Sequence, residues 1–172
     1  LCANTTEGTH NLPCNWSITN STAALNDGGQ VAIKVLGGDG TQGVWFGQGG
    51  VGVIEYNSPV DASLSEASIN NAGLVMFPQT FSAQNGIYQY NSVTDQSGLF
   101  TTQPLGASSW GSVEVNDVGH VGYRAGFGPG SGHAFSSRGT NPTQALHAVE
   151  AALDPISPYS FLFSCTFNNN RP

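Results

Sequence analysis

Four histidines and a few carboxylates are the side chains of this sequence that could do metal or acid–base chemistry. No two histidines stand four residues apart, so the paired ligands of a zinc-binding helix are absent. A glycoside hydrolase needs two facing carboxylates; four acids are available for this role, but the chain has few acids and a facing pair cannot be identified from the sequence. We therefore expect no metal site and no cofactor, and an extracellular glycoside hydrolase remains only the last alternative. The histidines are His10, His120, His133 and His147, and the acids considered are Glu55, Glu66, Glu114 and Asp117.

A glycine-rich stretch covers residues 126–139 and reads GFGPGSGHAFSSRG. It lacks the Gly-x-Ser-x-Gly spacing of a nucleophile elbow. It also lacks the Gly-Lys-Ser/Thr ending of a phosphate-binding loop. The sequence therefore predicts a flexible loop here and a protein that is not an enzyme.

Arginines and aromatic residues suggest binding rather than catalysis. Arg124 and Arg138 border the glycine-rich stretch, and a guanidinium there could bind the carboxylate of an acidic sugar. Each arginine could equally face solvent beside an acid. Aromatic rings can stack on sugars or fill the core, and the rings considered for either role are Trp110, Tyr123, Tyr88 and Tyr90. The candidates for receptor or glycan binding are Arg124, Arg138, Trp110 and Tyr123.

The cysteines and glycosylation motifs do not decide whether the protein is secreted. With three cysteines at least one thiol stays unpaired or bridges to another chain. Cys2–Cys14 would close a short loop, Cys14–Cys165 would join the two ends of the domain, and three reduced thiols are the third option. Asn-x-Ser/Thr motifs begin at Asn4, Asn15 and Asn20, as expected of a secreted protein but also by chance in a chain so rich in these residues.

The chain has few charges, and this excludes several function classes. Only 9% of its 172 residues are charged, and the net charge is −7. The four bases are too few and too scattered to neutralise a nucleic-acid backbone. No apolar run reaches the length of about 18 residues that a membrane helix needs. The length fits one domain over residues 1–172. The bases are Lys34, Arg124, Arg138 and Arg171.

Short apolar runs separated by Gly, Asn, Asp and Pro predict an antiparallel β-sandwich of Greek-key or jelly-roll type. Val31, Ile33 and Val35 alternate with polar or small residues, which indicates a strand with one buried face. No internal repeat is evident. The strands expected are 15–19, 30–36, 44–46, 51–56, 74–77, 87–90, 98–102, 112–115, 120–125 and 159–167.

The C-terminal third carries the two most specific structural predictions. Asn141 and Pro142 form a helix start, and apolar residues recur at 146, 149 and 153, so we expect one short helix over 142–153. In the last strand, period two places one row of side chains in the core. That row consists of Tyr159, Phe161, Phe163, Cys165 and Phe167.

In this order the segments resemble an adenovirus fibre head, the knob that ends the viral fibre. The motifs that carry the resemblance are 1–5 (LCANT) with 13–15 (PCN), 46–51 (FGQGGV), 73–80 (GLVMFPQT) and 157–161 (SPYSF). The sequence departs from the family at Cys2, where tryptophan is usual. The expected helix also falls where the heads have a long loop.

The resemblance implies a virion-surface protein that forms a homotrimer and attaches to a host receptor. That receptor would be a cell-surface protein or a sialylated glycan, and neither nucleic acid nor membrane insertion would be involved. The alternative is a secreted or cell-surface lectin-like adhesin, for which the glycosylation motifs and cysteines would matter.

Overall fold

The computed structural model describes residues 12–13, 15–18, 22–81, 85–102, 106–136 and 146–164. Every regular element within these ranges is a β-strand, and all strand pairs are antiparallel. The prediction of an all-β antiparallel fold is therefore confirmed. In the part of the chain described, no helix is long and apolar enough to cross a membrane.

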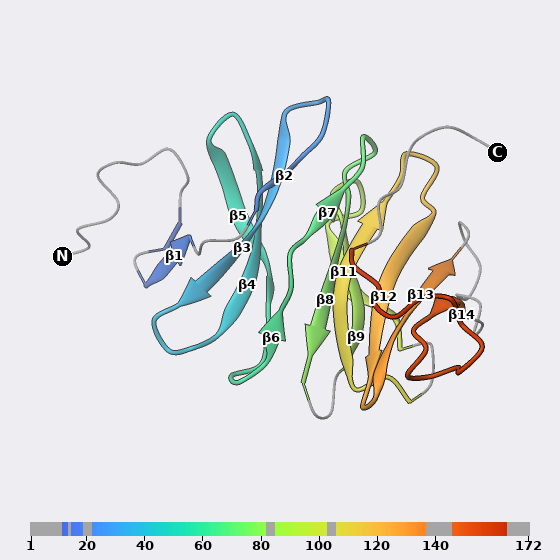
Figure 1. The fold of residues 1–172 in the computed structure, drawn as a ribbon. Helices are drawn as coiled ribbons and strands as arrows, with labels where there is room; N and C mark the ends of the chain where they lie inside the picture. The colour runs from blue at the N-terminus through green and yellow to red at the C-terminus, as the bar shows by residue number, and fades with distance from the viewer. Residues whose placement is uncertain are drawn as a thin grey trace.

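The strands form three sheets that stack face to face as layers (Figure 1). Sheet A contains β1 (Trp16–Ile18), β2 (Ala24–Leu25), β3 (Gln30–Gly37), β4 (Gln42–Gln48) and β5 (Val51–Asn57). Sheet B contains β6 (Ser63–Leu64), β7 (Ser68–Ile69), β8 (Leu74–Thr80), β9 (Gly86–Asn91) and β10 (Gln96–Thr101). Sheet C contains β11 (Ser109–Val115), β12 (Val121–Phe127), β13 (Gly130–Ser136) and β14 (Leu146–Val149).

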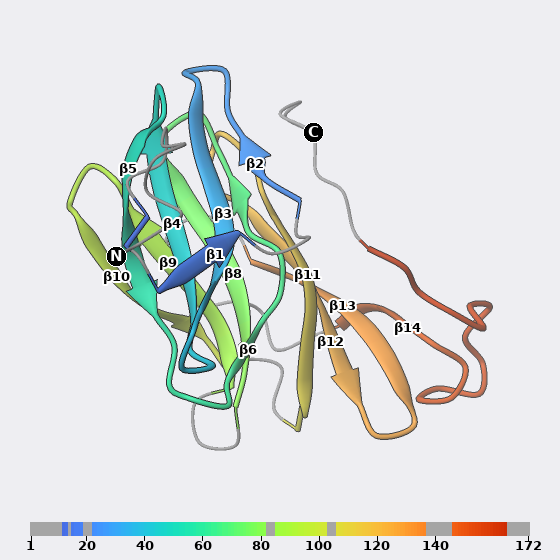
Figure 2. The same cartoon turned by 90° about the vertical axis from the view of Figure 1, so that its left-hand side faces the viewer.

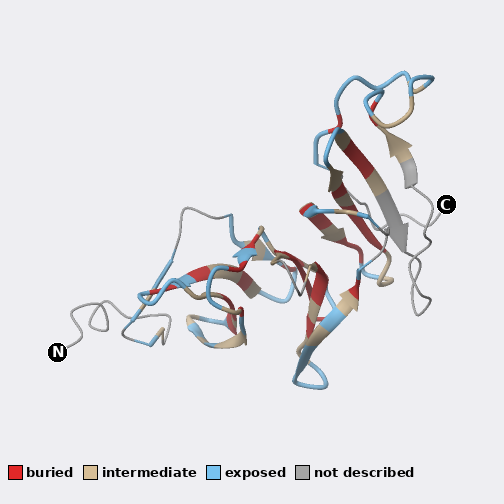
Figure 3. Ribbon diagram, turned by 90° about the horizontal axis from the view of Figure 1, so that it is seen from below, coloured by how far each residue is buried: buried red, intermediate tan, exposed pale blue. Residues whose placement is uncertain are grey.

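Sheet B is the middle layer, and both of its faces are buried. Successive residues of a strand point to opposite faces, so Val75 and Phe77 of β8 face sheet A while Met76 between them faces sheet C. The sandwich expected from the sequence thus has a third layer. Buried residues concentrate in the strands and exposed ones in the connecting turns (Figure 3).

Among the described residues, the long strands of each sheet are joined as consecutive hairpins, without a Greek-key crossover between them. Strands β3, β4 and β5 are neighbours in chain order, as are β8, β9 and β10, and as are the four strands of sheet C. The turn between β4 and β5 shows why the chain folds this way locally. Gly49 and Gly50 have φ values of +60° and +84°, and a two-residue hairpin turn of this kind needs positive φ at both positions.

The three sheets are three copies of one structural repeat, which the sequence prediction missed. In each copy a first strand leads into a turn of the form Asn-(Asp/Asn)-x-Gly, and a second strand follows. The pairing across this turn is the same each time: Leu25 with Val31, Ile69 with Val75, and Val115 with Val121. The turns are Asn26–Gly29, Asn70–Gly73 and Asn116–Gly119.

The first asparagine and the last glycine of each turn have the same roles in all three copies. The asparagine Oδ1 accepts the N–H of the residue four positions on: Gln30 at 2.9 Å, Leu74 at 2.9 Å and His120 at 2.8 Å. The glycine φ is +76°, +74° and +81° in chain order, a backbone region that side chains other than glycine enter at a cost.

The three turns are joined to one another across the layers, and we call these contacts the turn ladder. Asn26 Nδ2 donates to the Asn70 carbonyl at 2.9 Å, and Asn70 Nδ2 donates to the Asn116 carbonyl at 2.9 Å. One position further on, the Asp27 N–H donates to Asn71 Oδ1 and the Asn71 N–H donates to Asp117 Oδ1, both at 2.8 Å. The ladder therefore fixes how each sheet sits on the next.

Strand predictions between residues 16 and 127 are confirmed to within a few residues, but the C-terminal predictions are wrong. Residues 146–149 of the expected helix form strand β14, paired with β13, and no described residue of 142–153 is helical. The glycine-rich stretch is also largely a strand: β13 pairs with β12 from Gly130 to Ser136. Without β14, strand β13 would be an unpaired edge of sheet C, and pairing with this edge outweighs the helical spacing of the apolar residues.

The expected final strand over 159–167 is also corrected. Residues 159–164 form no strand, and Tyr159, Phe161 and Phe163 are 49%, 56% and 76% exposed. Leu162, which lies outside the row expected to be in the core, is the buried residue at 8% exposure. Cys165 and Phe167 lie outside the described residues.

Candidate binding surface on the C-terminal segment

Residues 150–164 lie against the outer face of sheet C, away from sheet B, and we call them the C-terminal cap (Figure 2). Arg124 of β12 points toward this cap, because its neighbours Tyr123 and Ala125 point into the core between sheets B and C. Because successive side chains of β12 point to opposite faces of the sheet, Arg124 lies on the face that the cap contacts.

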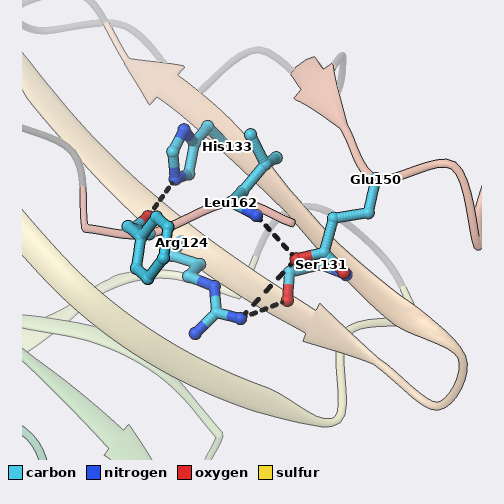
Figure 4. A network of polar contacts seen from close by, with 6 residues as sticks. Arg124, Ser131, His133, Glu150 and Leu162 are labelled. Atoms are coloured by element: carbon cyan, nitrogen blue, oxygen red, sulfur yellow. Dashed lines mark hydrogen bonds and ion pairs between the residues drawn. The ribbon is translucent and has the colours of Figure 1, made fainter. Parts of the chain in front are cut away.

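Glu150 at the start of the cap is buried and joins three parts of the chain (Figure 4). Its Oε2 accepts the Ser131 N–H and its Oε1 accepts the Leu162 N–H, both at 2.9 Å. Arg124 Nη2 donates to Ser131 Oγ at 2.6 Å and lies 3.8 Å from Glu150 Oε1. The backbone hydrogen bond from Leu162, that from Ser131 and the charge of Arg124 hold the pKa of Glu150 below its ordinary value.

One exposed phenylalanine ring lies beside the guanidinium of Arg124, and a second exposed ring lies against the first. The Arg124 Cζ stands 5.5 Å from the centroid of the Phe161 ring, within the range of a cation–π contact. Phe163 meets Phe161 edge to face, with centroids 4.9 Å apart. A ring nitrogen of His133 lies 2.7 Å from the Phe163 carbonyl oxygen and fixes this part of the cap to β13.

Arg124 keeps binding capacity despite these contacts. Its side chain is 30% exposed. Among the described residues, its hydrogen bond and ion pair both use Nη2, so Nη1 has no protein acceptor there. A guanidinium held in place, with one open nitrogen and the exposed ring of Phe161 beside the group, suits a ligand that has a carboxylate and an apolar face.

The other candidates from the sequence lie elsewhere. Trp110 and Tyr123 are 4% and 0% exposed and pack against each other in the core, with centroids 5.8 Å apart. They do not form the surface platforms considered above, and burial raises the pKa of Tyr123 to about 12. Arg138, Cys2 and Cys14 lie outside the described residues, so the cysteine pairing stays a prediction.

Tyr88 and Tyr90 are core residues as well, between sheets A and B. The rings at the surface of the cap were assigned to the core from their period-two spacing. Pro155 and Pro158 just before them were the signal that this run is not a central strand.

Among the described acids, Glu55 and Glu114 do not form a facing pair. Glu55 belongs to β5 of sheet A and Glu114 to β11 of sheet C, so sheet B stands between the layers that carry them. Asp117 is an acceptor in the turn ladder. Within the described ranges, no group of three His, Cys, Asp or Glu side chains is arranged to hold a metal ion.

No protein-family model matches the sequence, and no curated protein matches it.

Proposed function

We propose that this domain is a non-catalytic attachment module that binds an acidic glycan, or a receptor that carries one, through the C-terminal cap. The single observation that supports the proposal most is the Arg124 guanidinium. Its Nη2 is held by Ser131, its Nη1 has no acceptor among the described residues, and its Cζ lies 5.5 Å from the centroid of the exposed Phe161 ring. A sialylated glycan offers a carboxylate for the guanidinium and an apolar ring face for an aromatic side chain.

The cap favours binding because its groups are already placed before a ligand arrives. Glu150 and Ser131 fix the arginine, and the His133 contact fixes the backbone at Phe163. A binding group held in one geometry loses less conformational freedom on binding. A single site of this size binds weakly, and the homotrimer implied by the resemblance to fibre heads would turn three weak sites into firm attachment. In this form the domain would act at a virion surface.

Binding to an array of sialylated and neutral glycans, followed by titration of the best ligand, tests the proposal. Phe163→Ala removes a ring that is 76% exposed, and we expect a loss of affinity of about fivefold, which corresponds to about 1 kcal/mol. Arg124→Lys keeps the charge but loses the planar fork, so we expect a loss of the preference for acidic over neutral glycans.

Val93→Ala is the matched control, because Val93 is also a highly exposed apolar residue at 82% but belongs to the β9–β10 hairpin of sheet B. Thermal unfolding of each variant reports whether the fold is intact. Equal affinity of Phe163→Ala and Val93→Ala, or no preference for acidic glycans in the parent protein, would refute the binding site.

A secreted adhesin is the second candidate, because one glycosylation motif is accessible. Asn15 is exposed in the turn before β1. Mass spectrometry of the protein expressed in a secretory host tests this form, and an unmodified Asn15 would count against it. Light scattering tests the fibre-head form separately, because a stable monomer would contradict it and leave glycan binding unaffected.

A further inference from the structure

A buried tyrosine hydroxyl lies between two carboxylates where sheets A and B meet. Tyr90 of β9 is 4% exposed, and its ring packs against Phe46 of β4 with centroids 5.2 Å apart. Its hydroxyl donates to Asp95 Oδ1 in sheet B at 3.3 Å. Glu55 of β5 lies within hydrogen-bonding reach of the same hydroxyl. Sheet A thus supplies one acid and sheet B the other, at the edge where β5 and β10 lie side by side (Figure 2).

Glu55 reaches this hydroxyl because β5 contains a β-bulge. The pairing of β5 with β4 skips Glu55, since Ile54 and Tyr56 pair with consecutive residues of β4. A bulge of this kind changes the direction of a side chain. Tyr56 also points toward sheet B, where its hydroxyl donates to Gln79 Oε1 at 2.7 Å. Two consecutive side chains of β5 therefore reach the same sheet, whereas a regular strand would direct one of them away from it.

Asp95 is held beside the hydroxyl by the turn between β9 and β10. Its φ is +53°, in the left-handed region that residues other than glycine seldom adopt. Asn91 Oδ1 fixes the preceding residues of the turn by accepting the N–H groups of Val93 and Thr94. A conformation of this kind persists only where the surrounding structure holds it. Each sheet thus brings its carboxylate to the tyrosine through an irregular backbone position.

These three side chains are one hydrogen short at neutral pH. A tyrosine hydroxyl has a single hydrogen to donate, and an ionised carboxylate can only accept. While the Tyr90 hydroxyl donates to Asp95, its oxygen faces the ionised carboxylate of Glu55 without a hydrogen between them. Burial raises the pKa of Glu55 above its ordinary value, and the charge of Asp95 adds to this rise against the opposing hydrogen bond from Tyr90.

Neighbouring strands provide no base that would offset the two acids. Strands β4, β9 and β10 contain no charged residue. The charged residue of β3 is Lys34, and its Nζ donates to the Leu64 carbonyl at 3.1 Å. Among the described residues, the titratable groups that act on Glu55 are Tyr90 and Asp95. A proton from solvent is therefore what can relieve this contact.

We propose that Glu55, Tyr90 and Asp95 form a clamp between sheets A and B that closes when Glu55 takes up one proton from solvent in mild acid. The neutral Glu55 carboxyl then donates its hydrogen to the Tyr90 oxygen, while the Tyr90 hydroxyl continues to donate to Asp95. No other bond changes, and the three groups carry one negative charge instead of two. The folded state binds this proton more tightly than the unfolded chain does. The stabilisation is therefore complete below the ordinary pKa of about 4.3 and is lost as the pH rises through the raised pKa.

Thermal unfolding of the full chain from pH 8 to pH 4.5, beside Glu55→Gln, tests the clamp. The glutamine amide brings the missing hydrogen at every pH. We expect the Tm of Glu55→Gln to exceed that of the parent by a few degrees at pH 8, and the difference to shrink as the pH falls. Histidines titrate in both proteins and cancel in this difference. Glu66→Gln is the matched control, because Glu66 is exposed and accepts hydrogen bonds from Thr22, so this variant should keep the pH dependence of the parent.

Nuclear magnetic resonance titration of the Glu55 carboxyl gives a second measurement. We expect its midpoint to lie above about 4.3 and to fall in Asp95→Asn, which removes the repelling charge. Hydrogen exchange of the β5 amides, corrected for the intrinsic effect of pH, should slow in acid in the parent and not in Glu55→Gln. Parallel Tm curves of the parent and Glu55→Gln, or an unchanged midpoint in Asp95→Asn, would overturn the proposal. Neither result would affect glycan binding at the C-terminal cap, which lies on sheet C.

Discussion

Replacing Asn70 by alanine removes the central side chain of the turn ladder. Asn70 is 4% exposed. Its Oδ1 accepts the N–H groups of Ala72 at 3.1 Å and Leu74 at 2.9 Å, and its Nδ2 donates to the Asn116 carbonyl at 2.9 Å. Alanine can make none of these bonds, and all three partner groups belong to the backbone.

The magnitude follows from the number of bonds lost and from burial. A net hydrogen bond contributes about 1 kcal/mol, and a buried group left without a partner costs about 1–3 kcal/mol. The loss of three bonds at the buried Asn70 therefore lowers the free energy of unfolding by about 3–4 kcal/mol. Domains have only about 5–15 kcal/mol in total. At about 2–4 °C per kcal/mol for a chain of this size, the Tm should fall by about 6–16 °C.

Urea unfolding followed by tryptophan fluorescence measures the change, with Asn91→Ala as the control. Asn91 Oδ1 accepts the N–H groups of Val93 at 2.9 Å and Thr94 at 3.3 Å, and both of these bonds stay within one hairpin of sheet B. We expect Asn91→Ala to cost about 1 kcal/mol. A loss for Asn70→Ala no larger than that for Asn91→Ala would refute the role of the ladder in holding the layers together.

Three further predictions concern the ladder and the cap. Asn71 Nδ2 donates to Asp27 at 2.8 Å and to Asp117 at 2.9 Å, so Asn71→Asp should destabilise the protein by repulsion between like charges. In thermal unfolding, the decrease in Tm should be smaller in 1 M salt than in low salt, because salt screens this repulsion. Gly29 and Gly73 have nearly equal positive φ, but of the two an added Cβ collides only at Gly73, with Ser92 Oγ. Gly29→Ala should therefore lower the free energy of unfolding by about 1 kcal/mol and Gly73→Ala by more, and equal decreases in urea unfolding would contradict this. The fold lowers the pKa of Glu150. The ionised carboxylate therefore stabilises the fold at pH values above its ordinary pKa of about 4.3, and this stabilisation is lost as the pH falls through the lowered pKa. Hydrogen-exchange protection at Leu162 should be constant from pH 5 to 8 and fall in acid, and it should be weak at every pH in Glu150→Gln.

Most strands could be predicted from the sequence, and the C-terminal segment could not. Gln30–Gly37 lies between two glycine-containing turns, and Val51–Asn57 follows the turn at Gly49 and Gly50, so local residues determine these boundaries. Strand β14 was mistaken for a helix because Leu146, Val149 and Leu153 recur at helical spacing, while its pairing with β13 depends on a partner distant in sequence. In the candidate site, the charge of Arg124 is enough to predict it from the sequence. The period-two spacing of Phe161 and Phe163 instead predicts core residues, because such spacing does not show which face of a segment is covered by the rest of the protein.

The sequence by itself determined an all-β, antiparallel chain with few charges, since turn residues and period-two patterns act over a few neighbouring positions. The tertiary structure decided how the strands divide into layers. Asn26, Asn70 and Asn116 look like three ordinary turn residues in the sequence. They form one ladder only when the sheets stack, because each Nδ2 of Asn26 and Asn70 finds its acceptor in a turn more than 40 residues away. Likewise, Trp110 and Tyr123 are core residues and Arg124 is partly exposed because sheet B lies on one side of sheet C and the short cap on the other.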